Sequence, residues 1–181
     1  SDKNLDPYQH IENIGSSEKE DPYHFGYSLV KQIQETPNME IASHSHSHFY
    51  CLEKNSNNLS YEADIEASLV AFERLGEKPV SMVFCRNQYN QNSLEAISKY
   101  GFRTFRGTEN GLFYEPKAFK KQNFIMRGGR LTDSYINLTG PNFSTPKFVQ
   151  DELLNIPSSR FLRHSEYPFL QKVRLLRILS C

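Results

Sequence analysis

At residues 39–48 the chain reads Met39-Glu40-Ile41-Ala42-Ser43-His44-Ser45-His46-Ser47-His48. The first five residues have the apolar character of a strand, and the last five hold three of the six histidines of the chain. Imidazole nitrogens bind zinc and related divalent metals. A histidine cluster directly after a strand therefore indicates a metal site, although polar His/Ser stretches also occur in plain solvated loops.

The backbone of this stretch determines which histidines can share a metal. An extended backbone places His44, His46 and His48 on one side, because strand side chains alternate. A helical backbone pairs only His44 with His48, which then lie one turn apart on the same face. His44 and His48 converge in both cases. Because catalytic zinc usually takes three protein ligands, we expect an Asp or Glu from elsewhere to complete the pair.

Composition indicates an ordinary globular chain. The 181 residues include 21 Lys and Arg and 21 Asp and Glu, so the formal net charge is zero. This balance argues against the basic surface of a nucleic-acid-binding protein, and no apolar run reaches the roughly 20 residues of a membrane span. Cys51, Cys85 and Cys181 show no CxxC spacing and predict free thiols in a reducing compartment. We therefore expect one domain over residues 1–181, in the cytoplasm, with secretion as the alternative location.

Helix and strand signals alternate along the first 105 residues. Short apolar runs predict strands at 39–43, 80–85 and 102–105. The alternation is typical of βαβ units and predicts a parallel sheet in an α/β fold. The predicted helices lie at Asp21–Pro37 with Phe25, Leu29, Val30 and Ile33 as the apolar face, at Ser60–Gly76 with Ser60 as the N-cap, and at Ser93–Gly101.

Polar loops follow two of the predicted strands. The histidine cluster follows the strand at 39–43, and Arg86-Asn87-Gln88-Tyr89-Asn90 follows the strand at 80–85. Active-site residues of parallel sheets lie in loops after the carboxyl ends of the strands. We therefore expect the histidine cluster and the Arg86 loop to meet at the same end of the sheet.

Both loops resemble motifs of the polysaccharide deacetylase (NodB-like) family of carbohydrate esterases. Residues 40–48 resemble its second motif, which is a histidine, a Ser or Thr, two variable residues and a second histidine after a strand. Phe84-Cys85-Arg86-Asn87-Gln88-Tyr89-Asn90 resembles its third motif, an arginine loop, and is most similar to a subgroup of surface-polysaccharide biosynthesis proteins. In that subgroup a proline stands at the position of Cys85. Residues 101–107 and 155–163 resemble other segments of the subgroup.

The resemblance implies part of a deformed (β/α) barrel that removes acetyl groups from a polysaccharide or glycan precursor, N-acetyl in preference to O-acetyl. It implies one divalent metal, with zinc as first choice and cobalt or nickel as substitutes. His44 and His48 become metal ligands, Arg86 orients the catalytic base, and His46 falls on a variable position. Contacts to the substrate in the groove are expected from Asn87, Gln88, Tyr89 and Phe49.

The chain also departs from the family pattern. The first motif of the family ends in two adjacent aspartates, which supply the base and a third metal ligand, and no Asp-Asp pair occurs here. The late histidine that acts as the acid has no counterpart, since His164 follows no predicted strand. A complete barrel takes about 250 residues. We therefore expect a fragment, one incomplete domain without base or acid, that binds metal weakly and has little activity.

Two other functions fit the same residues. One is a deacetylase-like protein that has lost catalysis and binds a glycan or a protein partner. The other is a different metal-binding protein that uses His44, His46 and His48 together. Loss of His46 separates the family interpretation from the three-histidine interpretation, because only the latter requires this side chain.

Overall fold

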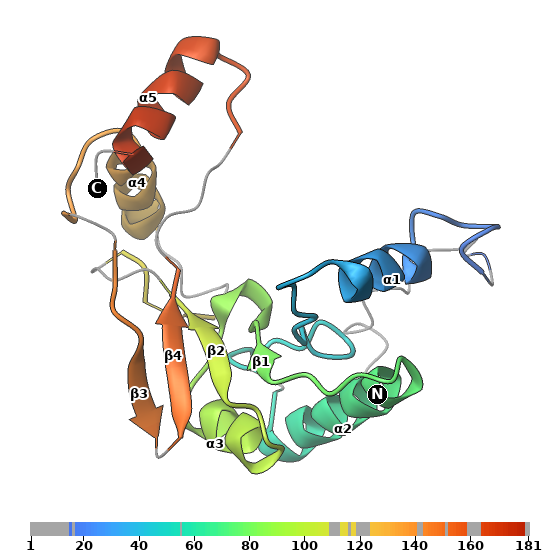
Figure 1. Ribbon diagram of the computed structural model, residues 1–181. Helices are drawn as coiled ribbons and strands as arrows, with labels where there is room; N and C mark the ends of the chain where they lie inside the picture. The colour runs from blue at the N-terminus through green and yellow to red at the C-terminus, as the bar shows by residue number, and fades with distance from the viewer. Residues whose placement is uncertain are drawn as a thin grey trace.

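The computed structural model describes residues 15, 17–54, 56–108, 113–115, 117–118, 124–140, 143–150, 152–158 and 164–179. These residues form a mixed α/β structure with a small four-stranded sheet of order β1-β2-β4-β3 (Figure 1). The predicted α/β class is confirmed. The described residues form an open sheet and do not close into a barrel.

Parallel pairing dominates the sheet. β1 (Ser81–Met82) pairs parallel with β2 (Thr104–Gly107), and β2 pairs parallel with β4 (Leu153–Pro157). β3 (Lys147–Gln150) pairs antiparallel with β4 and forms the edge. The alternation of elements predicted the parallel β1–β2 pair, whereas it gave no indication of the β3–β4 hairpin.

The predicted strand at 39–43 is reduced to a single parallel bridge between Ser43 and Met82. The Ser43 N–H donates to the Ser81 carbonyl at 3.0 Å, and the Val83 N–H donates to the Ser43 carbonyl at 2.8 Å. The segment still runs beside β1 in the same direction. The chains that follow Ser43 and Met82 therefore leave the sheet at the same end.

The other two predicted strands are shortened or shifted. β1 ends early because the chain turns into a 3₁₀ helix, η2 (Cys85–Asn87), in which Arg86 has a positive φ of 52°. β2 begins two residues later than predicted. The Phe102 N–H first donates to the Ile97 carbonyl at 3.1 Å, which closes the preceding helix before the strand can start.

The two central helices are capped three residues before their predicted starts. Asn57 Oδ1 accepts a hydrogen bond from the Ser60 N–H, and Asn90 Oδ1 accepts one from the Ser93 N–H, both at 2.9 Å. Ser60 as N-cap is therefore wrong. Asparagine caps a helix as well as serine does, and at both sites the asparagine comes first in the chain.

Gly76 and Gly101 end the central helices as predicted, with φ of 72° and 85° that favour glycine. These helices, α2 and α3, lie next to each other below the sheet (Figure 1). The helices are α1 (Tyr27–Glu35), α2 (Asn58–Arg74), α3 (Gln91–Lys99), α4 (Phe124–Asp133) and α5 (Pro168–Leu179).

The hydrophobic core lies between the sheet and the α2–α3 pair. Helix α1 contributes no buried side chain, and Leu29, predicted to face a core, is 60% exposed. Phe25, Val30 and Ile33 of the same predicted face are half-buried, so the described residues cover this face only in part. The buried cluster consists of Cys51, Tyr61, Ile65, Met82, Phe84, Leu94, Ala96, Ile97, Phe102, Phe105 and Leu153.

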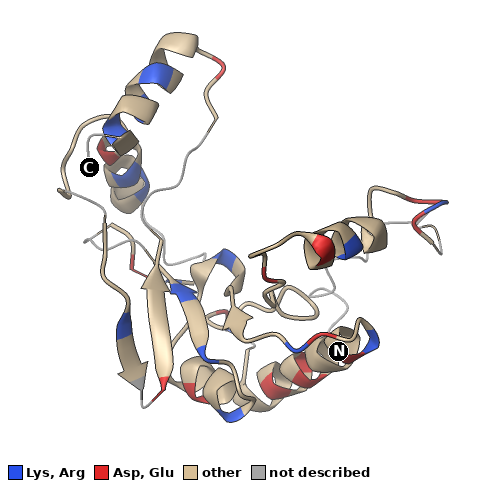
Figure 2. Ribbon diagram, in the orientation of Figure 1, with Lys and Arg blue, Asp and Glu red and all other residues tan. Residues whose placement is uncertain are grey.

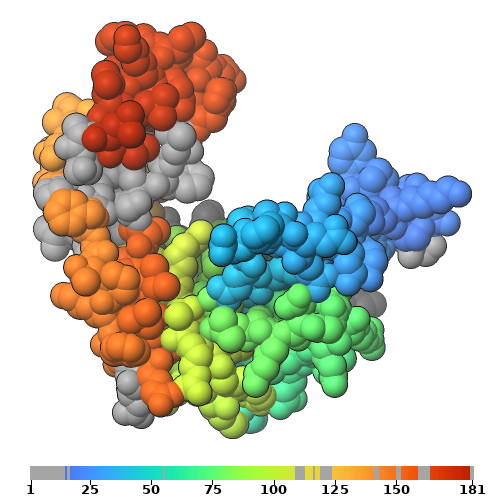
Figure 3. Space-filling model, viewed as in Figure 1, coloured from blue at the N-terminus to red at the C-terminus, as the bar shows by residue number. Residues whose placement is uncertain are grey.

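Helices α4 and α5 form a separate pair beyond the other end of the sheet (Figure 1). Asp133 at the end of α4 and Arg177 of α5 approach within 3.9 Å while both are buried. Figure 2 shows acidic residues along α2 and basic residues on α4 and α5. In Figure 3, α5 and α1 lie on opposite sides of a gap in the outline of the molecule. Within the described residues, no helix has the length and apolar character to cross a membrane.

Candidate metal centre

The histidine cluster and the Arg86 loop meet at the carboxyl ends of adjacent parallel segments. His44 follows the Ser43 bridge directly, and Cys85 begins η2 three residues after Met82. The Cys85 Sγ lies 3.2 Å from the His44 carbonyl oxygen, to which it donates. The predicted proximity of the two loops is confirmed.

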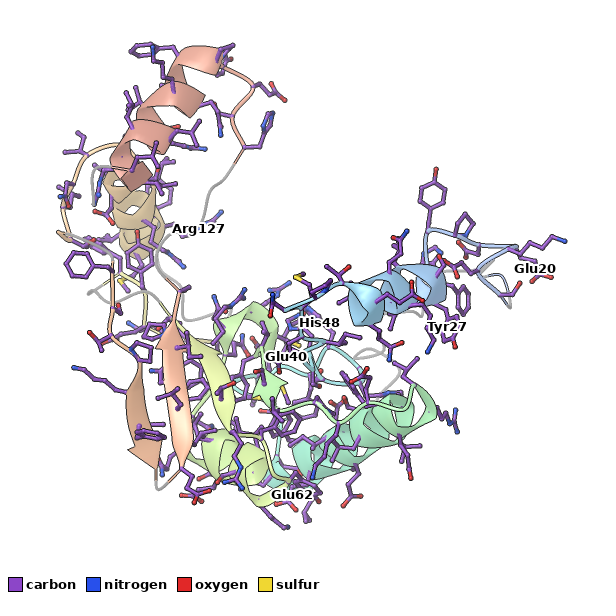
Figure 4. The ribbon with its side chains drawn as sticks, viewed as in Figure 1. Glu20, Tyr27, Glu40, His48, Glu62 and Arg127 are labelled. Carbon is purple, nitrogen blue, oxygen red and sulfur yellow. The ribbon has the colours of Figure 1, made fainter. Side chains whose placement is uncertain are left out.

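His44, His48 and Cys85 form one cluster of metal-ligating side chains. A ligand atom from each lies within 4.8 Å of the others, and among the described residues no other His, Cys, Asp or Glu group has this arrangement. The two imidazole rings meet edge to face with centroids 4.9 Å apart. His48 lies at the centre of the molecule, near α1 and the η2 turn (Figure 4). His46 is exposed and lies outside the cluster.

A backbone contact orients the His44 ring. Its Nδ1 lies 2.7 Å from the Val83 carbonyl oxygen. Because a carbonyl oxygen can only accept, Nδ1 carries the proton and donates, which leaves the lone pair on Nε2. Metal-binding histidines are commonly held by this kind of second hydrogen bond. The Ser43 bridge therefore sets the position of His44, and the Val83 carbonyl favours the tautomer with the proton on Nδ1.

Asp64 of α2 fixes the loop that carries the histidines (residues 44–53, called the histidine loop) through hydrogen bonds. Its buried carboxylate accepts hydrogen bonds from the His46 N–H at 2.9 Å and from the Ser47 N–H at 2.8 Å. The Ser47 hydroxyl adds a third bond at 2.5 Å. This role was not predicted from the sequence, because an aspartate near the start of a helix usually interacts with the positive end of the helix dipole. With the cap at Asn57, Asp64 falls one turn later, on the face buried with Ile65.

Backbone strain is concentrated in the two loops. Ser45, His48, Arg86 and Asn87 have φ of 64°, 56°, 52° and 53°, and Asn38 is the one other described non-glycine residue with positive φ. Each such residue costs about 1–2 kcal/mol. Strain of this kind persists only where surrounding contacts fix the backbone, and it occurs preferentially at functional sites.

Tyr50 connects the histidine pair to Arg86. The His48 and Tyr50 rings meet edge to face at 5.1 Å between centroids. The guanidinium carbon of Arg86 lies 4.8 Å from the centroid of the Tyr50 ring, within the range of a cation–π contact. Arg86 therefore lies on the same side of the loops as the histidine pair, with Tyr50 between them.

The other predicted site residues are placed differently. The Phe49 ring packs on Tyr61 at 5.2 Å and the Tyr89 ring on Phe105 at 5.3 Å, both against the core. Asn87 is half-buried and accepts a hydrogen bond from Arg106 at 3.1 Å.

Gln88 faces the interior and is only 1% exposed. Its Oε1 accepts from the Leu52 N–H at 3.1 Å, and its Nε2 donates to Glu53 at 2.8 Å. This position ties the Arg86 loop to the end of the histidine loop. The geometry is that of a loop-fixing side chain, so the direct substrate contact predicted for Gln88 would require the loop to open.

The electrostatics of the cluster favour the neutral form of the His48 imidazole. Burial, and then the nearby charges of His44 and Arg86, hold the pKa of His48 below its usual range, so its lone pair is available near neutral pH. Burial raises the pKa of the Cys51 thiol to about 12 and also raises that of Cys85. Two imidazoles and a sulfur are a donor set that fits zinc, cobalt or nickel and suits magnesium or calcium poorly.

Comparison with known proteins identifies the family. The family model described as polysaccharide deacetylase matches residues 11–105, which is more than half of the chain. The matched region contains the histidine cluster, Asp64 and the Arg86 loop. Searches of curated proteins and of solved structures give no match. The chain belongs to the polysaccharide deacetylase family.

Proposed function

We propose that this chain carries the metal-binding half of a deacetylase site that removes acetyl groups, N-acetyl in preference to O-acetyl, from a polysaccharide or glycan precursor. The observation that carries the proposal is the meeting of His44 and His48 at the strand ends, in a chain of this family. The family supports a hydrolase of carbon–nitrogen bonds. We also infer that the open sheet is one part of a deformed (β/α) barrel, and that residues 1–181 are one domain.

His44 and His48 would hold the metal, with zinc as first choice and cobalt or nickel as substitutes. When bound, a divalent metal supplies Lewis-acid activation of the acyl carbonyl and of water. The Val83 carbonyl keeps Nε2 of His44 free for this role. Arg86, held over Tyr50, would orient a carboxylate base, while Asn87 would contact the glycan beside it.

The absence of adjacent aspartates from the 181 residues favours a second function, a deacetylase-like protein that binds glycans without hydrolysing them. We place it second because the strained loops and the oriented His44 ring are features of a metal site rather than of a glycan surface. The free thiols of Cys51 and Cys85 support a reducing, cytoplasmic location. Cys181 lies outside the described residues.

Single histidine variants test the metal site. We expect His44→Ala and His48→Ala each to weaken zinc binding by about 100-fold or more, since loss of a supporting second-layer contact alone costs 10–100-fold. His46→Ala should bind zinc as the unaltered protein does, because this side chain lies outside the cluster. Isothermal titration calorimetry of the three variants measures the difference. Collapse of binding in His46→Ala would support the three-histidine interpretation instead.

Acetate release tests the reaction. We expect the 181-residue chain, supplied with zinc and an N-acetylated oligosaccharide, to release acetate at no more than about a thousandth of the usual enzyme rate of roughly 10 per second. The reason is that the histidine pair has no aspartate base beside it among the described residues. His44→Ala is the control for metal-dependent turnover. Fast release that His44→Ala abolishes would show that the chain supplies its own base.

A further inference from the structure

We propose that Cys85 supplies a third protein ligand to the metal held by His44 and His48, so that the site is a His₂Cys centre. This inference rests on the proposed metal site and specifies its donor set. The family pattern provides an aspartate as the third ligand, and no described Asp or Glu joins the histidine pair. The group that does join them is the Cys85 sulfur.

The distances permit this coordination with small side-chain movements. Zinc bonds of about 2.0–2.1 Å to nitrogen and 2.3 Å to sulfur place tetrahedral ligand atoms roughly 3.3–3.8 Å apart. The three donor atoms lie within 4.8 Å of one another. Closure by about 1 Å is within reach of rotations about the Cys85 and His48 side-chain bonds.

The backbone holds Cys85 in place for this role. The Gln88 N–H donates to the Cys85 carbonyl at 3.0 Å, and the left-handed Arg86 turns the chain directly after it. Among the described residues, the hydrogen-bond partners of the Sγ are weak: the His44 carbonyl at 3.2 Å and the Ser45 hydroxyl at 3.5 Å. Coordination would exchange these contacts for a metal–thiolate bond, with the thiol proton passing to solvent.

Comparison with the second described cysteine supports the same assignment. Cys51 is also buried and free, yet it lies outside the cluster. The two cysteines therefore provide a matched pair, one placed to bind metal and one not.

Cobalt spectroscopy of the full 181-residue chain tests the inference. Tetrahedral Co²⁺ replaces zinc in such sites, and a thiolate ligand adds a near-ultraviolet sulfur-to-cobalt charge-transfer band. We expect this band in the unaltered protein and in a Cys51→Ser/Cys181→Ser variant, whose one remaining cysteine is Cys85. Cys85→Ser should lose the band and bind cobalt about 100-fold more weakly.

X-ray absorption of the zinc-loaded protein gives a second readout that needs no variant at position 85. A sulfur shell at about 2.3 Å in the Cys51→Ser/Cys181→Ser protein supports the inference. Histidine-dependent metal binding without a sulfur shell or charge-transfer band overturns the Cys85 ligand and leaves the proposed function standing. Cobalt binding that is unaffected by both His44→Ala and His48→Ala overturns the metal site itself.

Discussion

Replacement of Asp64 by alanine is expected to lower the free energy of unfolding by about 2–3 kcal/mol and to weaken zinc binding together with it. The buried carboxylate accepts three hydrogen bonds from the histidine loop, through the His46 and Ser47 amides and the Ser47 hydroxyl. Alanine leaves these donors without their partner. It also releases the loop that keeps His48 in its left-handed conformation, so the two histidines no longer meet in a fixed geometry.

Urea unfolding followed by circular dichroism measures the stability change, and calorimetric zinc titration measures the affinity. Asp64→Asn is the matched control, because it keeps the shape and one acceptor oxygen while removing the charge. We expect it to fall between alanine and the unaltered protein in both measurements. Unchanged zinc affinity in a folded Asp64→Ala protein would mean that the loop holds its histidines without help from α2.

Replacement of Asp133 by alanine is expected to lower the free energy of unfolding of the α4–α5 pair by about 3–5 kcal/mol, a larger effect than that of Asp64→Ala. The rest of the protein should keep its stability. Asp133 is fully buried and accepts hydrogen bonds from the Leu138 and Thr139 amides at 2.9 and 3.0 Å and from the Tyr114 hydroxyl at 2.8 Å. Arg177 lies 3.9 Å away and is also buried. Removal of one partner of a buried ion pair leaves the other charge uncompensated, which is the costly step.

Hydrogen exchange resolved by peptide measures this local loss, with faster exchange expected in α4 and α5 and no change in α2 and α3. Zinc affinity should remain unaltered. Asp133→Ala is therefore the control for Asp64→Ala, because it shows whether loss of any buried carboxylate weakens zinc binding. A double change of Asp133→Ala and Arg177→Met should recover part of the loss, because no buried charge remains. Exchange that accelerates equally throughout the protein would contradict a confined effect.

The meeting of the two loops could be predicted from the sequence because it depends only on the direction of the strands. His44 and Arg86 follow neighbouring parallel segments, and the carboxyl ends of such segments share one edge. The positions at which the helices begin were predicted less well. Asn57 and Ser60 are both good caps, so local propensity could not choose between them.

Side-chain direction inside the loops was beyond sequence reasoning. Gln88 and Tyr89 read as polar groove residues, yet both turn inward because the left-handed Arg86 and Asn87 reverse the chain just before them. Asp64 was missed for the opposite reason, since its partners are backbone amides that leave no sequence pattern. The β4 strand pairs with β2 across about 50 residues, and no local signal encodes that contact.

The left-handed residues of the two loops also determine which substitutions these positions can accept over evolutionary time. Side chains branched at Cβ are the least compatible with positive φ, so Val, Ile and Thr are disfavoured at Ser45 and Asn87 whatever the metal or substrate. Glycine and asparagine adopt the same backbone at the lowest cost. The substitutions accepted at these two positions are therefore limited to a few small residues, independently of selection on the histidines themselves.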